Sequence, residues 1–130
     1  MNTVELNLMA GWSGIGMGFV SGGLMGLRFV GEQWLGGYTS LRRRLVRLGH
    51  IAFTALGFVN IAFALSVDAV AVAEPWQQIA SFSFIVGAAT MPFACFLAAW
   101  KHGLLPGLFA VPVASLFIGV GSLLIGWGLS

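Results

Sequence analysis

The sequence predicts an all-α integral membrane protein in which four transmembrane helices form an antiparallel up-down bundle, with both termini outside. The first observation is composition: the 130 residues are 58% hydrophobic and 8% charged, whereas a typical soluble domain is about 45–50% apolar and about 25% charged. The second is four apolar stretches long enough to span a bilayer, which takes about 20 helical residues. The third is that the charged side chains cluster around the loops between these stretches.

The four predicted spans form a single membrane domain of residues 1–130. They cover about 6–29, 48–67, 78–100 and 104–129. The first residues carry no basic side chain and the apolar run that follows is too long for a signal peptide, so we expect the first span to remain in the mature protein. The mean hydropathy of +0.96 argues against a soluble globular enzyme, a disordered chain, a nucleic-acid-binding domain and a disulfide-stapled secreted scaffold.

The distribution of charge predicts the orientation. The basic side chains flank the first and third loops: Arg28, Arg42, Arg43, Arg44, Arg47 and Lys101. The N-terminal segment and the second loop carry only acidic side chains: Glu5, Asp68 and Glu74. Because basic loops stay in the cytoplasm, both termini are expected on the outer side of a prokaryotic cytoplasmic membrane. The tryptophans agree, since all lie near span ends.

The first span carries glycine at every fourth position. These residues are Gly14, Gly18, Gly22 and Gly26, and Gly11 and Ser21 share their arc of the helix. Small residues let two helix backbones approach closely in a membrane. The face is therefore expected to pack either on another helix of this chain or on a partner chain or second copy.

The fourth span has a second set of small residues, Ser115 with Gly119 and Ser122 with Gly126. Since both the first and the fourth spans are rich in small residues, we expect them to pack against each other.

Two prolines lie inside the last two spans. Pro92 and Pro112 lack an N–H group, so each leaves a carbonyl four residues earlier without its helical partner. We expect kinks there, with Thr90 or Ser115 bonding to a freed carbonyl.

Asn60 lies near the middle of the second span. A buried amide is costly unless it is hydrogen-bonded, so we expect a bond across helices, with Ser81, Ser83 or Thr90 as partner. The alternative is contact with a ligand such as a quinone head group.

Two histidines form the main candidate for cofactor chemistry. His50 opens the second span and His102 follows the third, which places both at the same end of neighbouring helices. Two facing imidazoles there would hold a b-type haem or contribute to a metal site. The alternative is that both are ordinary polar residues at the membrane surface.

The run LRRRLVRL at residues 41–48 is amphipathic. Leu41, Leu45 and Leu48 share one side of a helix, and Arg43, Arg44 and Arg47 share the other. We expect an interfacial turn in which these arginines, together with Arg42, bind anionic lipid on the cytoplasmic side or an acidic partner. The alternative is a role in setting topology alone.

Catalytic machinery is not predicted. No Asp, Glu, Lys or Arg lies in the middle of a span, and the patterns of P-loops, serine hydrolases and zinc proteases are absent. We therefore predict no catalytic residue, no metal, no resident cofactor and no nucleic-acid partner.

Three functional hypotheses remain. The first is a small non-catalytic subunit that packs among other transmembrane subunits, or copies of itself, in a larger complex, including respiratory or photosynthetic ones. The second is a b-type haem or quinone-binding electron-transfer protein that uses His50 and His102. The third is a lipid or apolar-solute carrier, which needs a cavity near Asn60, Pro92 and Pro112.

Overall fold

The structure, a computed structural model, describes the backbone of residues 1–130 and the side chains of residues 1–104 and 106–130. It consists of four long helices: α1 (Thr3–Gly26), α2 (Leu41–Val70), α3 (Trp76–Trp100) and α4 (Leu105–Gly128). Two short 3₁₀ turns, η1 (Trp34–Gly36) and η2 (His102–Leu104), lie in the loops. All four long helices are long and apolar enough to cross a membrane. The predicted all-α class is confirmed, and each predicted span corresponds to one long apolar helix.

The helices differ from the predicted spans at their ends because caps, rather than hydropathy, set where a helix begins. Asn2 and Glu5 form a reciprocal capping box, so α1 starts three residues before the predicted span. The Ser40 side chain accepts a hydrogen bond from the backbone of Arg43, and α2 starts there, seven residues before the predicted span. The arginine run is therefore the first part of α2 itself.

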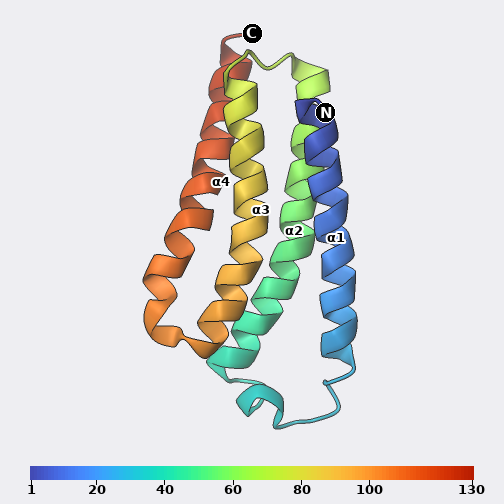
Figure 1. Ribbon diagram of the computed structural model, residues 1–130, viewed down its shortest axis with the longest axis vertical. Coiled ribbons are helices and arrows are strands. Elements are labelled where there is room, and N and C mark those ends of the chain that lie inside the picture. Colours follow the sequence, from blue (N-terminus) through green and yellow to red (C-terminus); the bar gives the residue numbers. More distant parts are fainter.

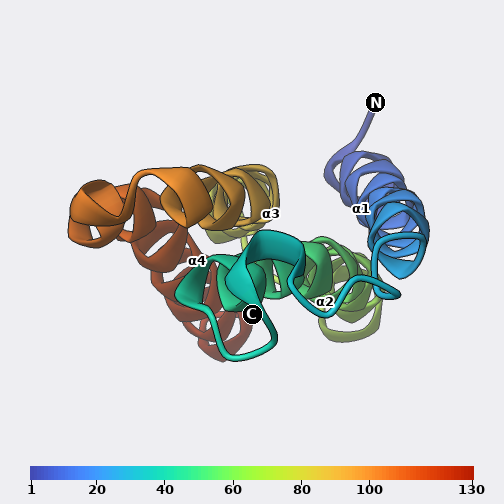
Figure 2. The same ribbon diagram turned by 90° about the horizontal axis from the view of Figure 1, so that it is seen from below.

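Each helix packs antiparallel against its neighbour in sequence. The extensive contacts join α1 to α2, α2 to α3 and α3 to α4. Seen along the helices, α1 and α4 lie at opposite ends of this row (Figure 1 and Figure 2). The expected packing of the first span on the fourth is therefore wrong. Short connections place consecutive helices side by side, and this outweighs the similarity of their glycine patterns.

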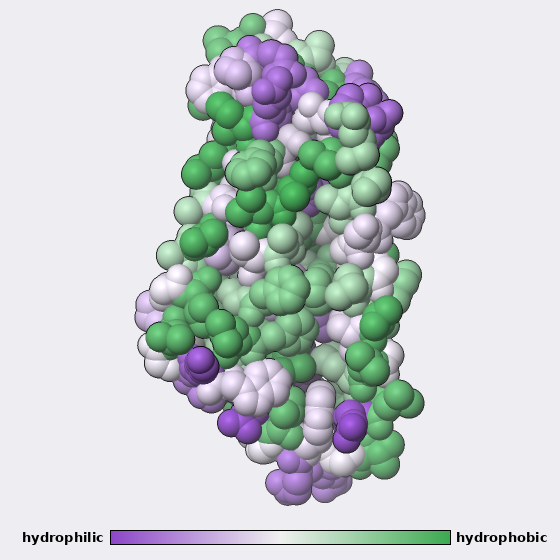
Figure 3. All heavy atoms as spheres, viewed as in Figure 1, coloured by the Kyte–Doolittle hydropathy of each residue, from purple (hydrophilic) through white to green (hydrophobic). Residues whose placement is uncertain are grey.

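The two ends of the bundle differ in charge. One end holds the 27–40 and 101–104 loops and all the lysine and arginine side chains, and we call it the basic end. The other, which we call the acidic end, holds both termini and the 71–75 turn, together with Glu5, Asp68 and Glu74. Hydrophobic side chains fill most of the visible surface between the hydrophilic ends (Figure 3). This banding is the pattern expected of a chain that spans a bilayer.

The buried core follows the two inner helices. One apolar cluster lies toward the basic end and includes Leu45 and Ala98, and a second lies toward the acidic end and includes Phe63 and Phe84. The outer helices contribute less to the interior, and large side chains such as Phe117 on α4 are exposed. The surfaces of α1 and α4 are thus mainly turned outward.

Pro92 and Pro112 are buried, and α3 and α4 continue through them without a break. Thr90 does not bond the carbonyl that Pro92 frees. Its hydroxyl donates to the carbonyl of Val86, four residues earlier, at 2.7 Å. The expectation for Thr90 is wrong because a threonine in a helix most easily reaches its own preceding turn.

Candidate functional site

The glycine face of α1 lies against α2. A methyl group added at Gly14 would stand 2.9 Å from the backbone oxygen of Phe53, and one at Gly57 of α2 would stand 2.6 Å from the backbone oxygen of Gly11. The space above Gly18 holds the Thr54 side chain. Gly26 differs, because an added methyl there would have no described side chain and no backbone of another helix within 4 Å. The face is therefore an internal helix contact, except at its last glycine.

His50 belongs to this same contact. Its Nδ1 lies 3.1 Å from the hydroxyl of Ser21, and its Cε1 is 2.7 Å from where a methyl on Gly22 would stand. His102 lies in η2 beyond the end of α3 and is exposed. The structure therefore does not bring the two imidazoles together: His50 faces α1, whereas the haem hypothesis needs it between α2 and α3.

Asn60 makes the expected bond across helices, but with a different partner. Its Nδ2 donates to the backbone carbonyl of Phe84 in α3 at 3.3 Å, and to Leu56 in its own helix at 2.9 Å. The proposed side-chain partners Ser81, Ser83 and Thr90 are wrong. Every turn of the neighbouring helix offers backbone carbonyls as acceptors for the Asn60 amide. A side-chain acceptor is available only if that helix is rotated so that the side chain faces Asn60.

Asn7 is a buried residue that the sequence analysis missed. It is 0% exposed, and its Nδ2 donates to the Ser81 hydroxyl of α3 and, at 2.9 Å, to the carbonyl of Thr3. The signal was in the sequence, since Asn7 lies one turn before Gly11 on the same arc of α1. The side-chain oxygens of both Asn7 and Asn60 are buried without a hydrogen-bond partner among the described residues.

Arg43 corrects the prediction for the arginine run. It is only 3% exposed. Its guanidinium carbon lies 5.3 Å from the ring centre of Phe29, 5.5 Å from Trp34 and 5.2 Å from Tyr38, and Nη1 donates to the carbonyl of Glu32 at 3.3 Å. The 27–40 loop thus folds over the start of α2 and encloses Arg43 by cation–π contacts. Arg43 is therefore not available to lipid or to an acidic partner.

The other arginines of the run are divided between structural contacts and the surface. Arg42 donates from Nε to the carbonyl of Ala99, at 3.2 Å, near the end of α3. Arg47 lies 4.9 Å from the Tyr38 ring centre, and Arg44 is exposed. On the leucine side of the run, Leu45 is buried whereas Leu41 and Leu48 are exposed. The prediction of one leucine side and one arginine side is therefore too simple. The start of α2 packs against the 27–40 loop as well as against a neighbouring helix, so burial does not follow a single face.

The small residues of α4 face α3 and the 71–75 turn. A methyl at Gly119 would stand 2.8 Å from the Phe84 ring, and one at Gly126 would stand 2.7 Å from Cβ of Trp76. Ser122 is buried and Ser115 is half-buried. These contacts draw α3 and α4 together toward the acidic end.

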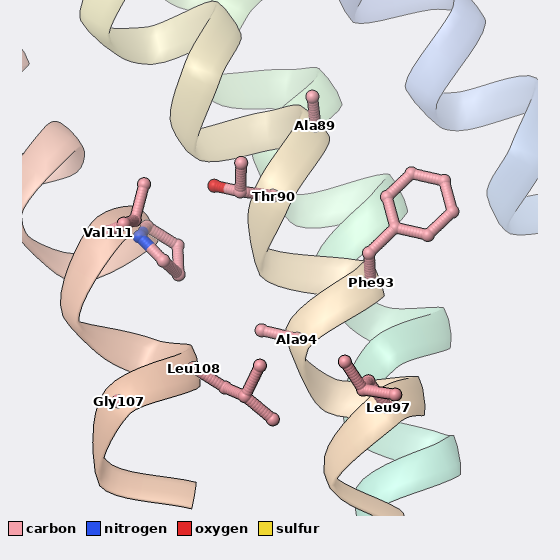
Figure 4. A pocket seen from close by; sticks show the side chains of 9 residues that line it. Ala89, Thr90, Phe93, Ala94, Leu97, Gly107, Leu108 and Val111 are labelled. Atoms are coloured by element: carbon pink, nitrogen blue, oxygen red, sulfur yellow. The ribbon is translucent and has the colours of Figure 1, made fainter. Parts of the chain in front are cut away.

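Toward the basic end, the ribbons of α3 and α4 diverge (Figure 1), and a groove of about 420 Å³ lies between them. Figure 4 shows Thr90 and Ala94 of α3 pointing toward α4, and Leu108 of α4 pointing toward α3. Among the described lining residues Thr90 alone has a polar side chain, and its hydroxyl already donates to its own helix. Pro112 lines this groove but Asn60 does not.

Within the described side chains, no group of three or more His, Cys, Asp or Glu residues is placed to hold a metal ion. The features that distinguish this bundle are thus its tight α1–α2 contact, the enclosed Arg43 and the α3–α4 groove. Comparisons with protein-family models, curated proteins and solved structures find no match to this chain.

Proposed function

We propose that this chain is an integral membrane protein with its basic end in the cytoplasm and both termini on the outer side. Support comes from the four apolar helices and from the separation of charge between the two ends. The positive-inside rule orients such a chain by the lysines and arginines of its short loops. A prokaryotic cytoplasmic membrane is the proposed location.

We further propose that it is a small accessory subunit, which binds other transmembrane helices through the outer face of α1. The observation behind this proposal is a second set of glycines on α1 that this chain leaves open. Among the described residues, no side chain and no backbone atom of another helix lies within 4 Å of a methyl added at Gly16 or Gly23. The two positions lie two turns apart on one side of the helix. Nearby Phe19 and Val20 are exposed. Open small residues among apolar side chains suit a second helix backbone.

The test is purification of a tagged copy from its native membrane in mild detergent. We expect stoichiometric partner chains, and we expect the double variant Gly16→Leu/Gly23→Leu to lose them. The matched control is Gly121→Leu on α4, because a methyl there also meets nothing within 4 Å. Purification of the wild-type chain alone would contradict the accessory role. So would equal recovery of partners with both variants.

The electron-transfer alternative has weaker support, since His50 bonds to Ser21 of α1 and His102 is exposed. A reduced-minus-oxidised absorption spectrum of the same preparation tests it. A b-haem band that disappears in both His50→Ala and His102→Ala would make this alternative the leading one. The carrier alternative draws support from the α3–α4 groove alone.

A further inference from the structure

The α3–α4 groove is nearly as long as one leaflet of the hydrocarbon core is thick. Its α3 wall runs from Ala89 to Leu97, which corresponds to about 12 Å along a helix. One leaflet of the hydrocarbon core is about 15 Å thick. The groove is open to the outside of the bundle, because Phe93, Leu97 and Val111 in its lining are 63%, 44% and 55% exposed. Its apolar lining can therefore be reached from the surrounding bilayer.

Hydrogen-bond donors lie where the groove ends, and they include the positively charged side chain of Lys101. The hairpin from α3 to α4 closes it there, and this hairpin bears the exposed side chains of Lys101 and His102. Arg42 donates to the carbonyl of Ala99, two residues before Lys101. Lysine offers three N–H donors, and the histidine ring offers at least one. The end of the groove is thus suited to a phosphate group.

We propose that the α3–α4 groove binds an anionic phospholipid of the cytoplasmic leaflet. One acyl chain lies along the groove, and the phosphate contacts Lys101 and His102, with Arg42 adding positive charge. This site shares only Arg42 with the lipid contacts expected of the arginine run, in which Arg43 is enclosed. The proposal rests on the membrane insertion proposed above, but not on the presence of partner chains.

The charge at its end favours a phospholipid over the other occupants of the groove. A partner helix would cover the apolar lining but would not by itself place an anion beside Lys101 and His102. An apolar solute would fit the lining but would make no use of the positive charge at the end. A phospholipid uses both the apolar wall and the charged end.

The experiment measures lipids retained by the full chain. The tagged protein is reconstituted in an equimolar mixture of phosphatidylglycerol and phosphatidylcholine with identical chains, then purified in mild detergent, and its bound lipids are counted by native mass spectrometry. We expect phosphatidylglycerol to be enriched. Lys101→Gln should lower its binding about five-fold, the factor that ~1 kcal/mol per basic residue implies.

Two matched pairs of variants separate the chain site from the headgroup site. Arg28→Gln removes an exposed charge at the same end but on the α1 side, and it should leave phosphatidylglycerol enrichment unchanged. Gly107→Leu places a large side chain at a residue that lines the groove, where an added methyl would meet no described side chain and no backbone of another helix within 4 Å. It should reduce retention of both lipids. Gly121→Leu, an equally open position on α4 outside the groove lining, should not. Helicity by circular dichroism checks that each variant folds.

Three results would overturn the proposal: no enrichment of phosphatidylglycerol, enrichment that Lys101→Gln leaves intact, or lipid retention that Gly107→Leu does not change. Its failure is distinguishable from failure of the proposed function. Alkaline extraction that releases the chain from the membrane would refute membrane insertion, and with it both proposals. An embedded chain that retains no lipid refutes the groove site alone, whatever partners it has.

Discussion

Gly57→Ala is the most direct test of the close contact between α1 and α2. The new methyl group would lie 2.6 Å from the backbone oxygen of Gly11 and 3.1 Å from the backbone nitrogen of Ile15. Carbon–oxygen contacts between packed helices are about 3.3–3.6 Å, so the helices must separate by roughly 0.7 Å at this point. The methyl would also lie 3.0 Å from Cγ1 of the Ile15 side chain. A rotamer change could move that atom, but it could not relieve the overlap with the two backbone atoms.

The energetic cost follows from that separation. A gap of about 0.5–1 Å forfeits a quarter to a half of each van der Waals attraction along the interface, and overpacked sites typically lose about 1–3 kcal/mol. Alanine also raises helix propensity by up to about 1 kcal/mol, which would hide part of the loss. Gly16→Ala is the matched control, because it has the same propensity gain and its added methyl meets nothing within 4 Å.

The assay is equilibrium unfolding in mixed micelles, with helicity followed as the fraction of denaturing detergent rises. We expect Gly57→Ala to be less stable than Gly16→Ala by about 1–3 kcal/mol, since the propensity terms cancel. This corresponds to roughly a 5- to 150-fold change in the folding equilibrium. Equal stability of the two variants would refute the close approach of α1 and α2.

Three further predictions concern other parts of the bundle. Asn60→Leu should lower the free energy of unfolding by no more than about 1 kcal/mol, because one hydrogen bond across helices is lost. Asn60→Asp should lower it by about 3 kcal/mol, because it places a charge deep in the membrane-spanning bundle. Similar losses for the two variants would contradict the buried position of Asn60. Arg43→Lys should lower the free energy of unfolding by about 1–2 kcal/mol, because its contacts with the aromatic rings are weaker, and should speed proteolysis in the 27–40 loop. The control Arg44→Lys should change neither property. If the loop of Arg43→Lys resists protease as well as wild type does, the guanidinium is not enclosed. In a Cys95→Ala background, an impermeant maleimide should label Ser130→Cys on intact cells but Gly31→Cys only after permeabilisation; the reverse pattern would overturn the proposed orientation.

Several features of the fold could be predicted from residue types alone. Helix number follows from hydropathy, because the bilayer or an equivalent apolar environment demands about 20 apolar residues for each span. The internal role of Asn60 could be anticipated too, since a buried amide must find a partner. Its actual partner, the carbonyl of Phe84, could not be predicted, because every residue has a backbone carbonyl and residue type does not indicate which one accepts the bond.

The glycine pattern illustrates the limit more clearly. Spacing alone marked a face of α1 for close packing, but it left open whether the neighbour was α2, α4 or another chain. The contact of Gly14 and Gly18 with α2 depends on helix order and on rotation about each axis. Two helices can have similar patterns, as α1 and α4 do, and still lie at opposite ends of the row (Figure 2).

The sequence by itself determined that this protein has four apolar helices and a basic end opposed to an acidic end. Hydropathy and charge are properties of single residues and of consecutive stretches, so both can be predicted without knowing which residues are in contact. Only the tertiary structure decided that Arg43 is enclosed by aromatic rings, that Asn7 meets Ser81, and that α3 and α4 diverge into a groove. Each of these features depends on contacts between residues from different helices or loops, and these contacts form only when the helices and loops have packed together.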